Sequence, residues 1–225
     1  MAKPAATRRQ EYAEQTRNAL IEAATQRMVE QGYEATSIAQ IAADVRVSKG
    51  AVYHHFPDKR SLFKAVFSEA TSRSVATVAE SMDHMRNSPP DDVVGMAIDA
   101  ALTTALKDRE YSVLRQQAAA ILSLEERKQI KADSIIPLVI QLHAELHDDA
   151  ATLQVDLDVA TSLILAILGA ASEDIAASDD PEKRYAQFRP ALIAMAKALV
   201  PKASGSFWGL KNLDRTWSHH QQSEL

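Results

Sequence analysis

The sequence predicts an all-α protein of about nine helices, and three observations lead to that prediction. Alternation of apolar and polar residues with a period of two, the mark of a half-buried strand, is never sustained. Apolar residues instead recur at intervals of three and four along most of the 225 residues. Six glycines are also few for a chain that would need many β-turns. We therefore expect helices that pack around a core large enough to fold unaided.

The composition indicates an ordinary soluble globular protein, with 46% hydrophobic and 24% charged residues. The absence of cysteine excludes a disulfide framework, a thiolate zinc site and a cysteine nucleophile, and it fits a cytoplasmic location. The N-terminus lacks the apolar segment of a secretion signal. The longest apolar run, residues 155–171, is interrupted by Asp156, Asp158 and Thr161. We therefore expect a buried helix there and no membrane association.

Charge is divided unevenly along the chain, whose net charge is −5. Residues 1–64 carry ten Lys/Arg against seven Asp/Glu, a net charge of +3. The remaining residues carry 15 basic against 23 acidic side chains, a net charge of −8. A basic end on an acidic body is expected when one domain meets phosphates and the other does not.

The first four helices are marked by their capping and breaking residues. The first is expected from about residue 12 to 30, and Gly32 ends it because glycine readily adopts a left-handed conformation. The second begins at Ser37, which fits a capping box with Gln40. The third covers residues 48–56 and is stopped by Pro57. The fourth runs from about residue 59 to 85, before an Asn-Ser-Pro-Pro segment.

The third helix has two contrasting faces. On a wheel of 100° per residue, Val52 and Phe56 define the inward face, and Gly50 and His54 fall nearly opposite. The rest of the outward side is hydrogen-bonding, cationic or aromatic: Ser48, Lys49, Ala51, Tyr53 and His55. Glycine inside a helix costs about 1 kcal/mol relative to alanine, and close approach of another molecule to the backbone would compensate for it.

A DNA major groove admits one such helix, whose N-terminal side chains reach the base edges while neighbouring polar groups hold phosphates. Lys49 could donate to guanine O6 or N7. Thr36, Ser37 and Lys59 stand near helix starts, where a phosphate is favoured. The arginines at 8–9 could enter the adjacent minor groove. Packing of the aromatic side chains on neighbouring helices is the alternative, but all these features together favour a helix-turn-helix over residues 37–56 that binds double-stranded DNA.

The same stretch resembles the TetR family of transcriptional regulators over about residues 12–74. The resemblance rests on many residues at fixed spacing: Ala23-Ala24, Gly32-Tyr33, Thr36-Ser37, Ile41-Ala42, Val47-Ser48-Lys49-Gly50, Val52-Tyr53, His55-Phe56 and Lys59. It implies a homodimeric repressor with two reading heads on a palindromic operator. It also implies DNA contacts by Thr36, Ser48, Lys49, Gly50, Tyr53, His55 and Lys59, to which we add Ser37, Ala51 and His54 from their positions.

One position departs from the family pattern, which usually has Ala-Gly between the second and third helices. This chain has Val45-Arg46 there. A left-handed turn at Arg46 would cost about 1–2 kcal/mol. Either the turn is built differently or Arg46 reaches a phosphate.

The resemblance divides the chain into four parts. They are a flexible basic arm (1–11), the DNA-binding domain (12–74), a helical effector-binding and dimerisation domain (75–200) and a C-terminal tail (201–225). In the third part, helices are expected at about 91–106, 109–122, 124–148, 156–177 and 181–199. Asp156 and Asp180 stand where N-caps are wanted, and Pro181 suits a first turn.

The last two helices, 156–177 and 181–199, are rich in small and aliphatic residues, and two copies would form a four-helix dimer interface. A monomeric core is the alternative, but a palindrome reader needs two heads ~34 Å apart. The middle helices would enclose a pocket for an unknown small-molecule effector. Polar residues on apolar helices are candidates for its lining: Arg115, Gln116, His143 and Glu173.

His143 and His147 have the i, i+4 spacing of a bidentate metal site. Histidines at an exposed helix end also complement the helix dipole, and we favour that interpretation. We therefore expect no metal site and no cofactor.

Two other functions are alternatives to a ligand-responsive repressor. A DNA-binding structural or nucleoid-associated protein without small-molecule input would have a middle domain filled by side chains. An enzyme is not expected, because the chain carries no serine elbow, P-loop, dinucleotide fingerprint or convergent pair of acids.

Overall fold

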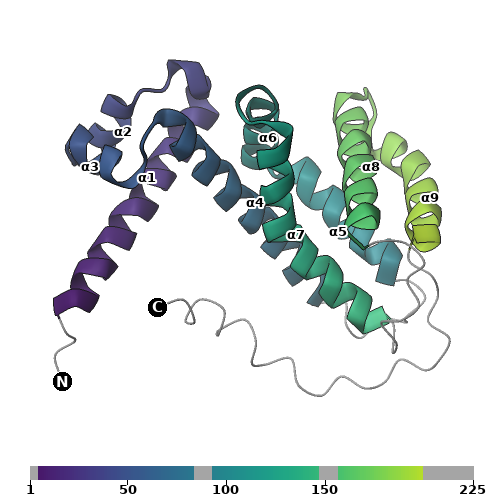
Figure 1. Cartoon of the computed structure of the whole chain (residues 1–225). Coiled ribbons are helices and arrows are strands. Elements are labelled where there is room, and N and C mark those ends of the chain that lie inside the picture. The colour runs from purple at the N-terminus through teal and green to yellow at the C-terminus, as the bar shows by residue number, and fades with distance from the viewer. Residues whose placement is uncertain (1–4, 84–92, 147–156, 200–225) are drawn as a thin grey trace.

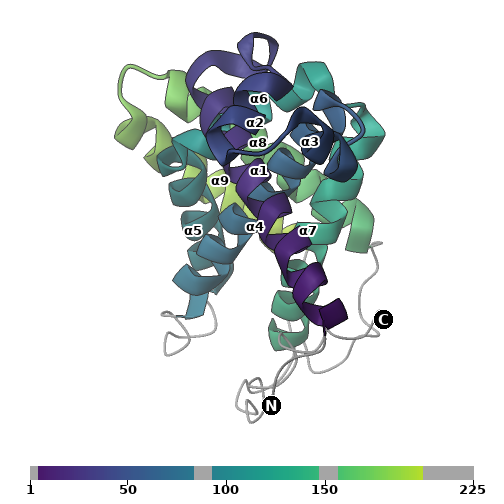
Figure 2. The ribbon, with the colours of Figure 1, turned by 90° about the vertical axis from the view of Figure 1, so that its left-hand side faces the viewer.

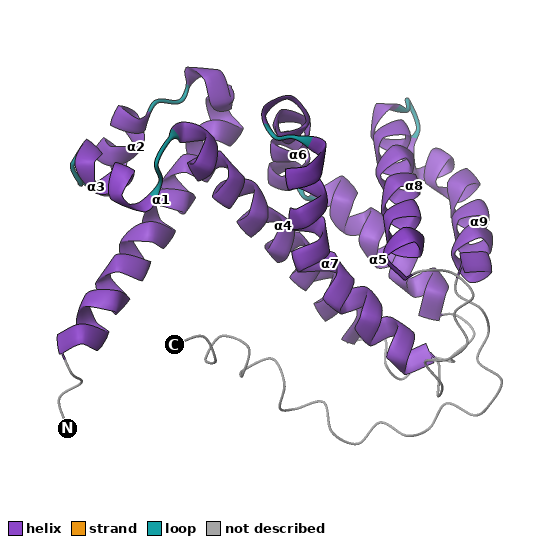
Figure 3. Ribbon diagram, in the orientation of Figure 1, coloured by secondary structure: helices purple, strands orange, loops and turns teal. Residues whose placement is uncertain are grey.

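The computed structural model describes residues 5–83, 93–146 and 157–199, and every regular element within these ranges is an α-helix (Figure 3). The helices are α1 (Ala5–Ala35), α2 (Ile38–Val45), α3 (Lys49–His55), α4 (Lys59–Asp83), α5 (Val93–Lys107), α6 (Arg109–Ile121), α7 (Leu124–Leu146), α8 (Leu157–Ala177) and α9 (Pro181–Leu199). These nine helices of the described ranges confirm the predicted all-α fold. The tail at 201–225 lies outside those ranges.

The helices α1, α2 and α3 form one end of the molecule, and α4 leads from that end into the remaining helices (Figure 1). Seen from this end, the first half of α1 extends downward, away from α2 and α3 (Figure 2). Tyr12 in that half is 68% exposed. The helix-turn-helix is therefore displayed at the tip of the molecule, and α4 and α6 connect it to the body.

The first helix is longer than the sequence predicted. Residues 5–11, expected to be part of a flexible arm, belong to α1, so that expectation is wrong for them. The physical reason is that neither glycine nor proline occurs between Ala5 and Gly32, and most residues there are good helix formers. Residues 1–4 and the side chains of residues 8–9 lie outside the described part.

Regular helical geometry ends at Gly32, as predicted. Its φ of 86° and ψ of 163° lie in a region that only glycine visits readily. The last residues of α1 follow this break, and the ring of Tyr33 packs edge-on against Phe63 with centroids 5.3 Å apart. The break turns the chain from α1 into α2.

Two hydrophobic cores hold the described residues together. The first unites α1, α2, α3 and α4 with α6 and the start of α7, through residues that include Met28, Ile41, Phe63, Leu114 and Ile130. The second joins α5, α8 and α9. The first core therefore extends past residue 74, the expected end of the DNA-binding domain. Leu114 and Ala118 of α6 belong to it.

The helix α8 is buried along one face only. By length and composition alone, residues 159–177 would suffice to cross a bilayer. Only 28% of that window is buried inside the chain. The sequence predicted a buried helix here, which is wrong for the single chain, since Leu163 is 46% exposed. Composition alone does not say whether an apolar helix is covered by its own chain or by another molecule.

The helix α9 begins as expected. The backbone N–H of Lys183 donates to Asp180 Oδ1 at 3.0 Å, which is an N-cap contact, and Pro181 is the first helical residue. The corresponding prediction for Asp156 lies outside the described residues.

Candidate nucleic-acid interface

The start of α2 is fixed by the predicted capping box. Ser37 Oγ accepts from the backbone N–H of Gln40 at 3.3 Å, and Gln40 Oε1 accepts from the backbone N–H of Ser37 at 2.8 Å. Both orphan donors at the helix start are thereby satisfied. Ile38 and Ile41 bury the inner face of α2, so the capping end stays at the surface, where Ser37 is exposed.

The turn between α2 and α3 is left-handed at Arg46, with φ 59° and ψ 41°. The backbone N–H groups of Arg46 and Val47 donate to Ala43 O at 3.1 Å and Ala42 O at 2.9 Å, closing the C-terminus of α2. A turn built differently is thus excluded, and a non-glycine residue occupies a conformation that glycine would adopt without cost. The Arg46 side chain is exposed.

The helix α3 presents the two faces that the wheel predicts. Ser48 Oγ accepts from the backbone N–H of Ala51 at 3.1 Å and caps the helix. Val52 and Phe56 are buried in the first core. The outward residues Ser48, Lys49, Gly50, Tyr53 and His54 are exposed, and Ala51 and His55 are half-buried. Their contacts with DNA remain a prediction.

Nothing inside the protein requires glycine at position 50. A Cβ atom added there would lie 3.7 Å from Ser48 Oγ, an ordinary van der Waals contact, and would meet no other described atom closely. The penalty of glycine in a helix is therefore not offset by internal packing. Close approach of another molecule to the backbone at Gly50, expected from the sequence, remains a prediction.

His55 and Arg17 lie beside each other at the edge of this face. Burial lowers the pKa of His55 below its usual 6.5, and the charges of His54 and Arg17 lower it further. The Arg17 guanidinium stands 5.2 Å from the centroid of the Phe56 ring. Sequence reasoning missed Arg17 because nothing in its local pattern reveals that the middle of α1 passes next to α3.

Thr36 is placed differently from the prediction. Its side chain is 1% exposed, its hydroxyl donates to Gly32 O at 2.8 Å, and it accepts from Gln31 Nε2 at 3.3 Å. The break at Gly32 leaves a carbonyl open, and Thr36 satisfies it. Its buried hydroxyl therefore fixes the approach to α2, and a phosphate contact by Thr36 remains a prediction.

Lys59 also has a role inside the protein. Its Nζ donates to Tyr33 O at 2.8 Å and to Thr36 O at 3.1 Å, and it stands 4.1 Å from the centroid of the Tyr33 ring. An ammonium group has three donors and no acceptor, so it suits a cluster of open carbonyls. A phosphate contact by Lys59, as predicted, would have to share donors with these carbonyls.

A residue of α6 completes the end of α1. Gln117 Oε1 accepts from the backbone N–H of Tyr33, and Gln117 Nε2 donates to Met28 O, both at 2.8 Å. One side-chain amide thus bridges the two sides of the break at Gly32. The sequence prediction chose the neighbouring Gln116, which is exposed, because periodicity alone did not identify the inward side of α6.

The body holds this end of the helix-turn-helix by ion pairs as well. Arg60 Nη1 donates to Glu126 Oε1 at 2.8 Å, and Arg60 Nε donates to Ile121 O at 3.3 Å. The hydrogen bonds from Arg60 lower the pKa of Glu126 to about 2, with the backbone N–H of Ser123 adding to the effect. The junction of α6 and α7 is therefore tied directly to the start of α4.

Of the four predicted pocket residues, the structure brings two together. Arg115 Nη1 donates to Glu173 Oε1 at 2.9 Å and joins α6 to α8. Gln116 faces solvent. His143 belongs to α7, but its side chain lies outside the described part, as does His147.

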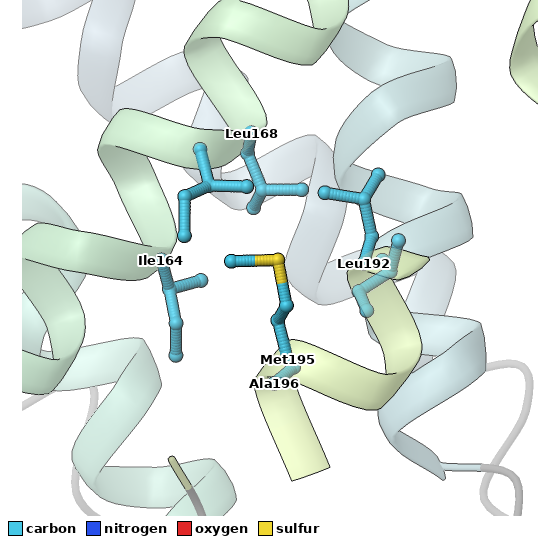
Figure 4. Close-up of a pocket in the computed structure, with 7 residues that line it drawn as sticks. Ile164, Leu168, Leu192, Met195 and Ala196 are labelled. Carbon is cyan, nitrogen blue, oxygen red and sulfur yellow. The ribbon is translucent and has the colours of Figure 1, made fainter. Parts of the chain in front are cut away.

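A small apolar cavity of about 10 Å³ lies between α5, α8 and α9 (Figure 4). It is lined by Ile98, Ile164, Ile167, Leu168, Leu192, Met195 and Ala196. A cavity needs at least about 10–15 Å³ to hold one water, so in this conformation it leaves no room for an effector. Within the described residues, no three His, Asp or Glu side chains are grouped to hold a metal ion.

Another polar cluster, between α5 and α9, is satisfied internally. Arg189 donates to both oxygens of Asp99, with Nε–Oδ1 2.8 Å and Nη2–Oδ2 2.7 Å, and the Tyr185 hydroxyl also donates to Asp99. Burial and the bond to Asp99 raise the pKa of Tyr185 to about 12. This cluster fastens α9 to α5 and leaves its carboxylate fully bonded.

Comparison with known proteins places the helix-turn-helix among bacterial regulators. Residues 20–66 match the model for "Bacterial regulatory proteins, tetR family". The chain is 38% identical over 64 residues to the transcriptional repressor AcnR of Corynebacterium diphtheriae, covering 28% of this chain and 34% of AcnR. It is 36% identical over 107 residues to the transcriptional regulator CymR of Pseudomonas putida, covering 46% of this chain and 49% of CymR. The matches thus span a third to a half of these relatives.

The similarity of fold extends over most of the chain. The crystal structure of RolR in complex with resorcinol superposes with a TM-score of 0.62, covering 88% of this chain and 98% of RolR at 22% identity. This likeness concerns the fold alone.

Proposed function

We propose that this protein is a cytoplasmic transcriptional repressor, since residues 20–66 match the model for the tetR family of bacterial regulatory proteins. It binds a palindromic double-stranded operator as a homodimer and is released by a small-molecule effector. The observation that carries the proposal is the exposed face of α3, whose polar and cationic side chains surround a glycine that internal packing does not require.

The geometry of α3 suits the major groove. Its N-terminal residues Ser48, Lys49 and Gly50 are exposed at the tip of the molecule, where a recognition helix contacts base edges. Tyr53 is 52% exposed, and a phenol there reaches a flanking phosphate. The exposed N-terminus of α2 at Ser37 offers a second phosphate site.

Dimerisation is supported by the exposed faces of α8 and α9. Leu163 and Met195 are each 46% exposed. Small residues on the same two helices are exposed as well: Ala166, Ala170, Ala194 and Ala198. A second copy of this pair would cover these side chains in a four-helix interface, since small residues allow close approach of helices.

Release by an effector requires a link between the body and the helix-turn-helix. The helix α6 contributes to the first core and holds the end of α1 through Gln117. A ligand that prefers one position of α6 over another would therefore change the spacing of the two heads.

The proposal is tested with a duplex selected from a random library by the parent protein. We expect Lys49→Ala and Tyr53→Ala to weaken binding by roughly 10- to 100-fold, because each base or phosphate contact contributes about 1–3 kcal/mol. Lys128→Ala is the matched control, since Lys128 is an exposed lysine on α7, away from α3. Equal affinity of the parent, K49A and K128A, with thermal unfolding unchanged, would contradict this docking.

A DNA-binding structural protein without an effector is the second candidate. The cavity between α5, α8 and α9 leaves no room for an effector in this conformation, which favours this candidate. Such a protein would enrich no sequence from the library, whereas a repressor would enrich one site.

A further inference from the structure

Three cations meet on the inner side of α6 and α7. Arg127 and Lys131 are four residues apart on α7 and therefore share one face of that helix. Arg115 approaches from α6. Burial lowers the pKa of Lys131, and the charges of Arg127 and Arg115 lower it further. Lys131 is thus the group on which the charges of the other two act, and we call the three side chains the cationic site.

This positive charge has little compensation. Arg115 pairs with Glu173 at 2.9 Å, but the side chain of Glu173 is 66% exposed to solvent. The Nε of Arg127 is fully buried without a hydrogen-bond partner. Among the residues that the structure describes, no side-chain hydrogen bond or ion pair is formed by Arg127 or Lys131. Both residues are half-buried, and removing a cation from water without a partner is costly, so an anion bound beside them would offset that cost.

Apolar residues continue the same stripe of α7. Ile135 and Leu138 follow Lys131 at helical spacing, and both are half-buried. Gly169 of α8 lies near the Arg115 guanidinium, whose Nη1 would be at an ordinary contact distance of 3.6 Å from a Cβ atom at that position. A molecule lying along this stripe would meet cations at one end and aliphatic side chains at the other.

We infer that the cationic site of Arg115, Arg127 and Lys131 binds the carboxylate or phosphate group of a small amphipathic molecule, whose apolar part lies toward Ile135 and Leu138. This inference rests on the proposed function, because it assigns a chemical class to the effector. An anion bound here would compete with Glu173 for Arg115, and Arg115 lies two residues from Gln117 on α6. Binding would thereby act on the helix that holds the end of α1.

The test measures thermal unfolding of the full chain with benzoate, hexanoate and inorganic phosphate, and with the uncharged benzamide and hexanamide. We expect at least one of the anions to raise the Tm of the parent while its amide does not. Lys131→Met should weaken that binding about tenfold or more, the effect of losing one charged contact. Lys128→Met, one turn away on the exposed side, should bind like the parent.

K131M should also unfold at a higher Tm than the parent without ligand, because it removes an unpaired cation and keeps the aliphatic stem. Stabilisation by phosphate alone would identify a phosphate group as the anion. Stabilisation by the amides as large as by the acids, unchanged anion binding in K131M, or no stabilisation by any of the three anions would overturn the inference. Operator binding is measured separately without ligand, so loss of the proposed function would be seen independently of these shifts.

Discussion

At the scale of single residues, Arg46 bears the clearest conformational cost. It holds φ 59° between α2 and α3, where the family pattern has glycine. Its side chain is exposed, so internal packing does not account for it. Either arginine is tolerated at a cost in stability or its charge is used on the DNA.

Arg46→Gly separates these two possibilities. We expect the variant to be more stable by about 1 kcal/mol, since glycine adopts this conformation without strain. Chemical denaturation of the parent and the variant measures that difference. If Arg46 contacts a phosphate, the operator affinity of R46G should also depend less on salt than that of the parent, by about one ion per subunit. A variant less stable than the parent would contradict the strain assigned to this turn.

His55 makes the helix-turn-helix sensitive to acid. Its pKa in the folded chain lies below the ordinary 6.5, because it is partly buried and stands near His54 and Arg17. The unfolded chain therefore binds the proton more readily. The stability contributed by neutral His55 is complete above pH 6.5 and declines as the pH falls toward its folded pKa.

The prediction for His55 is a comparison with His55→Gln. The difference in unfolding free energy, parent minus variant, should decrease when the pH is lowered from 7.5 to 5.5. Denaturation curves at several pH values measure this, and the variant controls for every other titrating group. A difference that stays constant or grows on acidification would contradict the burial of His55.

At the scale of elements, the end of α1 is the most heavily constrained junction. Gly32 breaks the helix, and Thr36, Lys59 and Gln117 bond the groups that the break exposes. Three different segments thus converge on one turn. The orientation of α2 and α3 relative to the body depends on these bonds.

Gln117→Leu should cost about 1–3 kcal/mol of stability, because it leaves a backbone donor and an acceptor of α1 without their partner. Gln116→Leu is the matched control, since Gln116 is exposed on the same helix, and it should change stability little. Equal stabilities of the two variants would mean that the Gln117 bridge contributes nothing.

The sequence predicted helices and caps well because these depend on neighbouring residues. The Ser37–Gln40 capping box and the break at Gly32 are local, and both are observed as predicted. Contacts between residues far apart in the chain could not be predicted from the sequence. Gln117 lies 84 residues from Tyr33, and no periodicity distinguishes it from Gln116. The burial of Thr36 likewise depends on the carbonyl of Gly32, four residues earlier, which loses its helical hydrogen bond at the break and accepts from the Thr36 hydroxyl.

At the scale of the whole molecule, we expect the exposed apolar faces of α8 and α9 to pack against a second copy of the protein. A double variant, Leu163→Glu with Met195→Glu, places charges in the proposed four-helix interface. Sedimentation should show monomers, and operator affinity should fall roughly 100-fold or more, because the two heads no longer bind as one unit.

Leu124→Glu is the control for that variant. Leu124 is 61% exposed at the start of α7, away from α8 and α9, so the charge alone should leave the assembly unchanged. A double variant that stays dimeric would place the interface elsewhere.

The central claim is that a dimer reads a palindrome through α3, and the selection of bound duplexes from a random library tests it most directly. The account predicts one enriched sequence with two inverted half-sites about one helical turn apart, ~34 Å between centres. It also predicts that Lys49→Ala alters the preferred bases within each half-site. Enrichment of no sequence, or of a single half-site without symmetry, would contradict it.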